Sequence, residues 1–475
     1  MTRKIKWLSF VLCLVFVVTA FAGCGGSKDA AKPDASQPAA DTPKEEPKKD
    51  AAPASKAEIS YMAWYNNETE PKETQKTLDK FNSEQDKINV KLVSVAYADY
   101  VTKLNTMASS NSLPDSGMMM ESQVIKWAVN GKLADVSDMY SGSDAPLDSL
   151  AFKYKGKPVA YSCANEVLLL YYNKKLFDDA KIDYPPVSAD KAWTWQEFVD
   201  VAKKLTKDKN GKTPNDAGFD AKNIVTYGAN FNTISWMWPV LAISNGGGLV
   251  SQDGKELLLG KPETIEAAQA IADLNLKHHV APTPATLATF PTLDVTLLSG
   301  KVAMATSGQW EIGVSLKNSL KDGLKYGVAV LPKMKTPVTL NTGGPQVIFN
   351  TSKNLDATKE FIKWYVKEEN NWSLIESGIW MPVSKKWYTD ETLMKKWVDN
   401  EFHPKLEEYK PAVIDYAMNN AQQVPWYFFP GYDRMDEVIG PGMDPVWTGK
   451  KTAKEAIEGD ILPKVQKIFD ENKVQ

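Results

Sequence analysis

Cysteine and histidine are scarce in this chain, and their scarcity limits the chemistry available to it. The 475 residues contain three cysteines and three histidines. Cys13 and Cys24 fall in the N-terminal segment, so Cys163 has no partner for a disulfide within the rest of the chain. No pair of Cys or His residues has the spacing of a zinc site. We therefore expect no internal disulfide, no metal and no cofactor.

The sequence also lacks an excess of positive charge and a second long apolar run. The formal net charge is -3, and the Lys and Arg residues are spread along the chain. This distribution argues against a nucleic-acid-binding face. No run of about 18 apolar residues follows the N-terminal one, so no later segment is expected to cross a membrane.

The N-terminal run has the parts of a secretory signal peptide. Basic residues at positions 3, 4 and 6 precede an uncharged, mostly apolar stretch, and Ala22-Gly23 stands directly before Cys24. The pattern resembles the lipobox of bacterial lipoproteins, although Phe21 stands where leucine is usual. We expect residues 1–23 to be removed and Cys24 to be acylated. A plain signal peptide with a chance cysteine, or an uncleaved anchor, is the alternative.

Residues 24–57 contain almost nothing that a core could bury. They are rich in Ala, Pro, Lys, Asp and Glu and contain no aromatic residue. Such a composition predicts a disordered linker. With the expected lipid on Cys24, the folded part would be tethered to the outer face of the cell membrane.

From residue 59 onward the pattern alternates between strands and helices. Residues 59–64, 88–92, 116–120 and 167–172 read as strands, and apolar residues at helical spacing follow the first three of them. Thr194 and Glu197 have the spacing of a capping box at a helix start. This order predicts an α/β fold with mostly parallel sheets flanked by helices.

Tryptophan is abundant, and its positions suggest two different uses. The chain has 15 Trp, and several stand beside Gly, Pro or Asn in predicted loops. Aromatic side chains in loops are better candidates for ligand contact than those inside helices. We place Trp127 and Trp364 in helix cores. For Trp236, core packing and ligand contact remain equally open.

A series of short motifs resembles the extracellular solute-binding proteins of bacterial carbohydrate ABC importers, the family that includes maltose-binding protein. The motifs are Trp64, Leu113-Pro114-Asp115, Tyr172-Asn173-Lys174, Pro185-Pro186, Thr194-Trp195, Gly246-Gly247-Gly248-Leu249, Asp253-Gly254, Gly300-Lys301-Val302-Ala303-Met304, Gly308-Gln309-Trp310 and Gly343-Gly344. Each motif is weak alone, and their order over some 400 residues carries the resemblance. It implies a two-lobed periplasmic-binding-protein fold of type II with a hinge. Lobe 1 would comprise 58–165 and 342–382, and lobe 2 would comprise 166–341 and 383–475.

The resemblance also implies which residues contact the ligand. The expected residues are Trp64, Asn66, Asn67, Glu68, Glu121, Gln123, Glu166, Trp236, Trp238, Trp310 and Trp426. Aromatic rings suit the apolar faces of sugars, and carboxylates and amides suit their hydroxyl groups. Residues 118–123 differ from those of maltose-binding protein, so the resemblance leaves the identity of the sugar open.

The implied function is a non-catalytic receptor. A mono- or oligosaccharide would bind between the lobes of a monomer, and the closed form would deliver it to a membrane permease of an ABC importer. Two alternatives remain: a surface glycoside hydrolase, whose carboxyl pair would also lie among aromatic residues, and the same fold with a non-sugar ligand such as a peptide or polyamine.

Overall fold

The computed structural model describes residues 56–65, 70–142 and 144–473. The predicted signal peptide, Cys24 and residues 24–55 of the predicted linker lie outside the described residues. The same holds for Asn66, Asn67 and Glu68.

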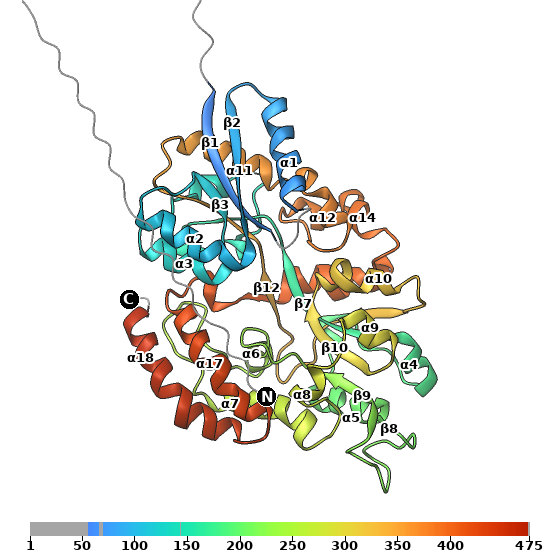
Figure 1. The fold of residues 1–475 in the computed structure, drawn as a ribbon. Helices are drawn as coiled ribbons and strands as arrows, with labels where there is room; N and C mark the ends of the chain where they lie inside the picture. Colours follow the sequence, from blue (N-terminus) through green and yellow to red (C-terminus); the bar gives the residue numbers. More distant parts are fainter. Residues whose placement is uncertain (1–55, 66–69, 143, 474–475) are drawn as a thin grey trace, which may run out of the picture. The chain divides into compact units, whose positions relative to one another are not determined.

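One part of the fold is built on a five-stranded sheet of order β2-β1-β3-β13-β6. Its strands are β1 (Ala57–Tyr65), β2 (Ile88–Ala96), β3 (Ser116–Met118), β6 (Tyr161–Ser162) and β13 (Pro345–Ile348). β1 is parallel to β2 and β3, whereas β13 is antiparallel to β3 and β6. The helices beside it are α1 (Glu70–Glu84), α2 (Tyr97–Ser109), α3 (Glu121–Val129) and α11 (Leu355–Tyr365) (Figure 1).

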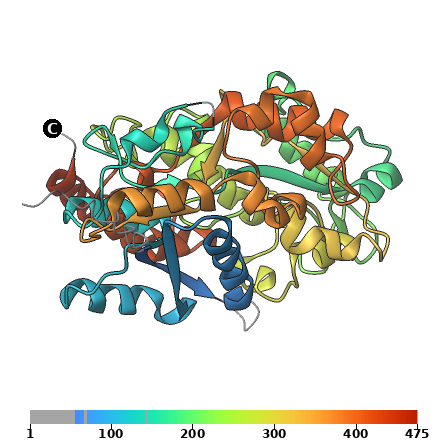
Figure 2. The same ribbon diagram turned by 90° about the horizontal axis from the view of Figure 1, so that it is seen from above.

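The alternation of side chains along β1 explains why this sheet is covered on both faces. Tyr61 packs against Phe361 of α11 with 5.5 Å between ring centroids, and Phe361 packs against Phe81 of α1. Met62 points to the opposite face, where its backbone carbonyl accepts a hydrogen bond from the Tyr100 hydroxyl of α2. α1 and α11 therefore cover one face and lie side by side (Figure 2), and α2 covers the other.

The second part is built on a seven-stranded sheet in which β14-β12-β7-β10-β9-β8 form the main path and β11 also pairs with β7. Its strands are β7 (Glu166–Asn173), β8 (Lys207–Asp208), β9 (Ile224–Asn230), β10 (Val302–Gly308), β11 (Tyr326–Ala329), β12 (Thr339–Thr342) and β14 (Ala421–Gln423). β4 (Lys153–Tyr154) and β5 (Lys157–Pro158) form a separate pair. Figure 1 shows β9 and β10 beside α5 and α9, in the part of the molecule that also contains α7, α17 and α18.

The remaining helices complete both parts. They are α4 (Lys174–Ala180), α5 (Trp195–Leu205), α6 (Pro239–Ser244), α7 (Pro262–Leu276), α8 (Pro284–Leu287), α9 (Leu293–Leu298), α10 (Lys317–Ser319), α12 (Trp372–Glu376), α13 (Lys386–Thr389), α14 (Glu391–Val398), α15 (Leu406–Tyr409), α16 (Tyr416–Asn420), α17 (Tyr432–Trp447) and α18 (Leu462–Asn472). Short 3-10 or π turns are η1 (Ser137–Tyr140), η2 (Asp148–Leu150), η3 (Ala189–Lys191), η4 (Ile312–Leu316), η5 (Glu368–Asn370), η6 (Lys410–Asp415), η7 (Pro425–Tyr427) and η8 (Glu455–Ile461).

The α/β class is confirmed, but the sheets are mixed rather than mostly parallel. β7 runs antiparallel to β10, β11 and β12. β7 does not enter its sheet through a βαβ crossover, because it follows directly from β6 of the other sheet through the residues around Asn165. A strand that enters from a neighbouring sheet need not follow the direction that a crossover helix imposes.

Two local expectations can be checked directly. The Thr194–Glu197 capping box is present at the start of α5, with both reciprocal hydrogen bonds formed. Cys163 is a buried free cysteine.

Among the described residues, no helix is both long and apolar enough to cross a membrane. Within the same residues, no group of three His, Cys, Asp or Glu side chains could hold a metal ion.

Candidate functional site

Three tryptophans from separate segments of the chain come together in the second part of the fold. Trp236 lies in the turn before α6, Trp310 follows β10, and Trp426 belongs to η7. The ring centroids of Trp236 and Trp426 are 5.2 Å apart, and those of Trp236 and Trp310 are 6.2 Å apart. Trp236 and Trp310 remain partly exposed, whereas Trp426 is 8% exposed. We call this group the tryptophan cluster.

The position of Trp310 depends on a glycine. The Trp310 ring lies over the backbone of Gly308, where a Cβ atom would come within 2.0 Å of the ring. The amide of Gln309 donates to the carbonyl of Val167 at 2.8 Å and fixes this turn to β7. The Gly308-Gln309-Trp310 motif therefore allows the ring to fold back over the end of β10.

Two glutamates lie where the two sheets meet. Glu121 is the first residue of α3, and Glu166 is the first residue of β7. Glu166 Oε2 accepts a hydrogen bond of 3.0 Å from Thr342 Oγ1 on the paired strand β12. We call Glu121 and Glu166 the carboxyl pair.

Burial governs the protonation of the carboxyl pair. It raises the pKa of Glu121 to about 7. Burial, followed by the nearby charge of Glu121, raises the pKa of Glu166 to about 8. Two carboxylates in a poorly solvated site repel each other, so the pair retains protons near neutral pH. It can both donate hydrogen bonds to a ligand and accept them from it.

The segment η7 links the tryptophan cluster to the carboxyl pair. Its Tyr427 hydroxyl is buried, and its pKa is raised well above the usual range by burial and by the charges of Glu121 and Glu166. Tyr427 Oη and Trp426 Nε1 are both buried without a hydrogen-bond partner among the described residues. Buried polar groups without a partner are uncommon in folded proteins. The core residues Trp238 and Trp387 also leave Nε1 without a partner, so this state alone does not identify a ligand contact.

Sequence reasoning did not identify Tyr427 or Thr342. Tyr427 stacks on Phe152, with 4.1 Å between centroids and 17° between planes. The one available signal for Tyr427 was its position beside Trp426 in the aromatic run 426–429. Thr342 gave no signal, because its contact with Glu166 depends on the register of β12 against β7.

The expected residues of the first sheet occupy one edge of it. Trp64 is near the carboxyl end of β1 and meets Tyr100 edge to face at 5.2 Å. β1 and β3 are parallel, so Trp64 and the Glu121 that follows β3 lie toward the same edge. Gln123 is partly buried in the first turn of α3.

Trp238 does not belong to the tryptophan cluster. Its side chain is 0% exposed and meets Trp447 of α17 at 6.0 Å, edge to face. The turn that holds Trp236 continues directly into α6, which directs Trp238 into the core while Trp236 stays at the surface. We therefore remove Trp238 from the candidate site.

An ion pair joins the elements on either side of the candidate site. Lys126 Nζ of α3 lies 2.7 Å from Asp433 Oδ2 of α17, and the Asp433 side chain is 8% exposed. This contact and the packing of α3 against η7 hold the carboxyl pair beside the tryptophan cluster.

Comparisons with known proteins show the family and the fold of the chain. The model of the bacterial extracellular solute-binding protein family matches residues 76–401. The maltotriose-binding protein of Pyrococcus abyssi is 27% identical over 289 residues, which cover 58% of this chain and 56% of that protein. The match thus spans little more than half of that relative.

Two further similarities cover more of the compared protein. The maltooligosaccharide ABC transporter solute-binding lipoprotein of Streptococcus pneumoniae is 25% identical, over 74% of this chain and 76% of its own. The crystal structure of the cyclic alpha-maltosyl-1,6-maltose binding protein from Arthrobacter globiformis superposes with a TM-score of 0.69 at 20% identity. That similarity covers 88% of this chain and 100% of the other, and it establishes the two-lobed fold.

Proposed function

Because the chain belongs to the bacterial extracellular solute-binding proteins, we propose that it captures a sugar outside the cytoplasmic membrane and delivers it to an ABC permease. The proposed ligand is a mono- or oligosaccharide. Relatives named for maltotriose and maltooligosaccharides support this class.

The observation that carries the proposal is the tryptophan cluster beside the carboxyl pair. Contiguous indole rings provide flat apolar surface of the kind that the C–H faces of sugar rings cover. Glu121 and Glu166 supply hydrogen-bonding groups beside that surface. More than one ring in a row suits more than one sugar unit, so we favour an oligosaccharide.

Binding is proposed to close the two lobes on the ligand. Trp64 and Glu121 come from the first sheet and its helices, and Trp310 and Trp426 from the second part. A ligand that touches both lobes favours the closed form to the extent that it binds that form more tightly than the open form.

For the two lobes we propose the boundaries expected from the sequence. Lobe 1 comprises residues 58–165 and 342–382, and lobe 2 comprises residues 166–341 and 383–475.

The screen that tests the ligand class is a thermal-shift assay. The panel contains maltotriose, longer maltooligosaccharides, diacetylchitobiose, monosaccharides, amino acids, short peptides and spermidine. A ligand at about 100 times its dissociation constant stabilises the folded state by about 2.7 kcal/mol. We expect an oligosaccharide to raise the Tm. A shift by peptides or spermidine, with none by any sugar, would rule out the sugar class.

A hydrolase would also use a carboxyl pair among aromatic residues, so catalysis needs its own assay. The protein is incubated with each oligosaccharide that raises its Tm, and new reducing ends are measured. We expect none, because we propose a receptor that releases its ligand unchanged. Turnover that disappears in Glu121→Gln or Glu166→Gln would establish the hydrolase instead.

The lipid anchor on Cys24 remains part of the proposal. A tether would keep the receptor close to its permease and raise their effective concentration. Mass spectrometry of the mature N-terminus should find a chain that starts at Cys24 and carries two or three acyl chains, since one chain anchors only marginally. An unmodified N-terminus elsewhere would remove the anchor without affecting the receptor assignment.

A further inference from the structure

The segment between α12 and α13, residues 378–384, touches both halves of the candidate site, and we call it the strap. Met381 of the strap pairs with Asn165, which directly precedes Glu166. The Met381 amide donates to the Asn165 carbonyl at 3.1 Å, and the Asn165 amide donates to the Met381 carbonyl at 3.2 Å. The strap is therefore fixed to the start of β7, where Glu166 of the carboxyl pair lies.

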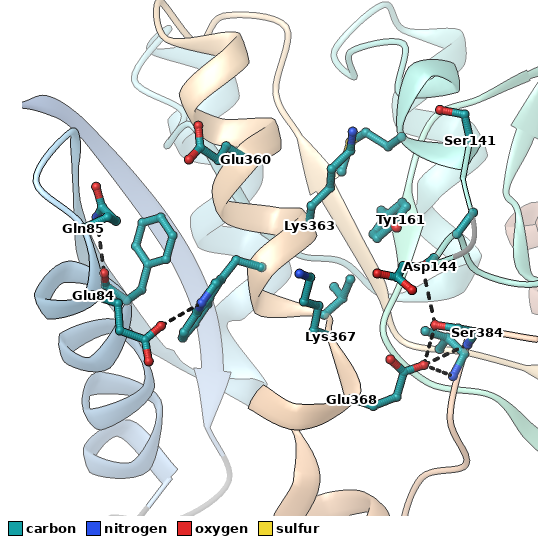
Figure 3. Close-up of a pocket in the computed structure, with 16 residues that line it drawn as sticks. Glu84, Gln85, Ser141, Asp144, Tyr161, Glu360, Lys363, Lys367, Glu368 and Ser384 are labelled. Atoms are coloured by element: carbon teal, nitrogen blue, oxygen red, sulfur yellow. Dashed lines mark hydrogen bonds between the residues drawn. The ribbon is translucent and has the colours of Figure 1, made fainter. Parts of the chain in front are cut away.

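The last residues of the strap are held by η5. Glu368 of η5 is 3% exposed, and its carboxylate accepts from the Ser384 amide at 2.8 Å and from the Ser384 hydroxyl at 2.6 Å (Figure 3). The Val383 carbonyl accepts from the Leu147 amide at 2.9 Å. A shift of the strap would leave the buried Glu368 carboxylate without these donors, so its end is a fixed point.

The first residue of the strap holds the turn that carries Trp310. The Gly378 carbonyl accepts from Gln309 Nε2 at 3.1 Å and from the Gly313 amide at 3.2 Å. Gln309 directly precedes Trp310 and is 0% exposed, so its side chain is covered by protein rather than available to a ligand. Its contact with the strap acts on the indole through the backbone of the turn.

The strap and the turn are packed backbone against backbone. Gly378 has a φ of 77°, and a Cβ atom there would come within 2.7 Å of Ile312 Cγ2. A Cβ atom on Gly313 would come within 2.5 Å of the Ile379 amide nitrogen. No flexible side chain lies between the two backbones to absorb a displacement, so a shift of one is passed to the other.

Stability does not account for a glutamine at position 309. Gln309 Oε1 is buried and has no hydrogen-bond partner among the described residues, which costs free energy. Without Gln309 Nε2, the Gly378 carbonyl would still accept from the Gly313 amide. A methionine of similar length would fill the same space. What it would not supply is the directed bond from the Trp310 turn to the strap.

From these contacts we infer that Gln309 is a positioning residue of the sugar site, which sets the place of Trp310 relative to Glu166 through the strap. The inference rests on the proposed function, in which both residues contact the sugar. The contacts run from Trp310 through Gln309 to the strap, and from the strap to the residue before Glu166. A ring and a carboxyl group that meet one ligand together need a fixed separation, because a small misplacement weakens both contacts.

The position of Trp310 is tested first without a ligand. Fluorine NMR of the chain labelled with fluorotryptophan resolves individual indoles, and Trp310→Phe identifies the resonance of Trp310. Glu311→Gln changes the other sequence neighbour of Trp310 and gives the shift that a neighbour alone produces. We expect Gln309→Met to move or split the Trp310 resonance by more than Glu311→Gln does. An equal or smaller change would overturn the inference, whether or not a sugar binds.

Sugar affinity tests the consequence for binding. Calorimetric titrations use maltotriose and diacetylchitobiose as probes. For the probe that binds the parent, we expect Gln309→Met to weaken binding about tenfold, and to have little effect in a Trp310→Ala background, because Gln309 acts through that ring. An equal loss in both backgrounds would overturn the inference.

The matched control is Thr264→Val. Thr264 is a buried polar residue whose Oγ1 accepts from the Gly248 amide at 2.9 Å and donates to the Leu258 carbonyl at 2.8 Å. This variant should bind sugar like the parent. A loss equal to that of Gln309→Met would point to general destabilisation and would also overturn the inference. If neither probe nor any other sugar bound the parent, the proposed function would fail, and the NMR comparison would still decide the role of Gln309.

Discussion

Tryptophans of the cluster and tryptophans of the core differ in what surrounds the same side chain. Trp238, Trp387 and Trp397 are 0–1% exposed. The indole of Trp397 donates to the Trp387 carbonyl at 3.2 Å. Trp236 and Trp310 keep part of their surface exposed and lie against each other. Packing accounts for the core group, whereas the exposed rings of the cluster are available to a ligand.

The local backbone explains the difference. Trp238 directly precedes α6, and Trp387 and Trp397 lie on helices whose apolar sides face the core. Trp310 follows the end of β10. In α/β folds the ends of strands and the loops after them carry ligands, while helix faces bury apolar surface.

The largest expected effect is a loss of stability when a tryptophan of the core is removed. Trp238→Ala should lower the free energy of unfolding by about 3–5 kcal/mol, because it leaves a cavity in a closely packed site. Denaturant titration measures the loss. The sugar affinity of the folded fraction should change little. A small loss of stability together with a large loss of affinity would return Trp238 to the candidate site.

Trp310→Ala should have the opposite effect from Trp238→Ala: a large loss of sugar affinity and a smaller loss of stability. Its affinity for the best sugar of the screen should fall by about 2 kcal/mol or more, about 30-fold, since a stacked ring is removed. The free energy of unfolding should fall less than in Trp238→Ala, because the ring is already partly exposed. Calorimetric titration and denaturant titration of both variants give the comparison. Unchanged affinity would show that the cluster is not the binding surface.

Gly308→Ala tests the position of Trp310 without altering the ring. The new methyl group would come within 2.0 Å of the indole and force it away. We expect stability to fall by about 1–3 kcal/mol, as in other overpacked sites, and sugar affinity to fall with it. Gly459→Ala is the matched control, because its added methyl group meets no atom within 4 Å. If both variants bind sugar like the parent, the Gly308 contact does not position Trp310.

The last effect concerns the carboxyl pair and the dependence of stability on pH. The folded-state pKa of Glu166, about 8, is above its ordinary value of 4.5. The folded state therefore binds more protons than the unfolded state between these values, and stability falls as the pH rises from about 4.5 to 8. Across this window we expect the free energy of unfolding to decrease steadily, because Glu166 loses in the folded state a proton that burial had retained.

Denaturant titrations of the parent and of Glu166→Gln at several pH values isolate the contribution of Glu166 to the pH dependence of stability. The groups nearest Glu166 are Glu121 of α3, Tyr427 of η7 and Thr342 of β12, and the Tyr427 hydroxyl stays neutral in this range. The variant should lose less stability between pH 5 and pH 8 than the parent. An identical pH dependence in both would show that Glu166 is ionised throughout the window.

Local signals in the sequence predicted local structure well. The apolar alternation that predicted a strand at 59–64 corresponds to β1, and the Thr194–Glu197 spacing corresponds to a complete capping box. These features depend on neighbouring residues, so the sequence carries them directly. The direction of β7 and its pairing with β12 depend on residues more than 150 positions apart, and no local pattern reports them.

In the candidate site, too, some features follow from the local sequence and others depend on the tertiary structure. The family resemblance supplied Trp310, Trp426, Glu121 and Glu166 as candidates, and the loop position of Trp310 after Gly308 favoured ligand contact for that residue. Trp236 and Trp238 stand two positions apart in one aromatic segment, and the sequence could not separate them. Only the start of α6 decided which ring faces the core.

By itself the sequence determined the α/β class, the family and the kinds of side chain available for binding, because these follow from periodicity, motif order and composition. The tertiary structure alone decided which tryptophans meet, and which carboxyl groups are desolvated together. Contact, burial and the pKa values that burial sets are properties of residues brought together from distant parts of the chain, and only the folded arrangement specifies them.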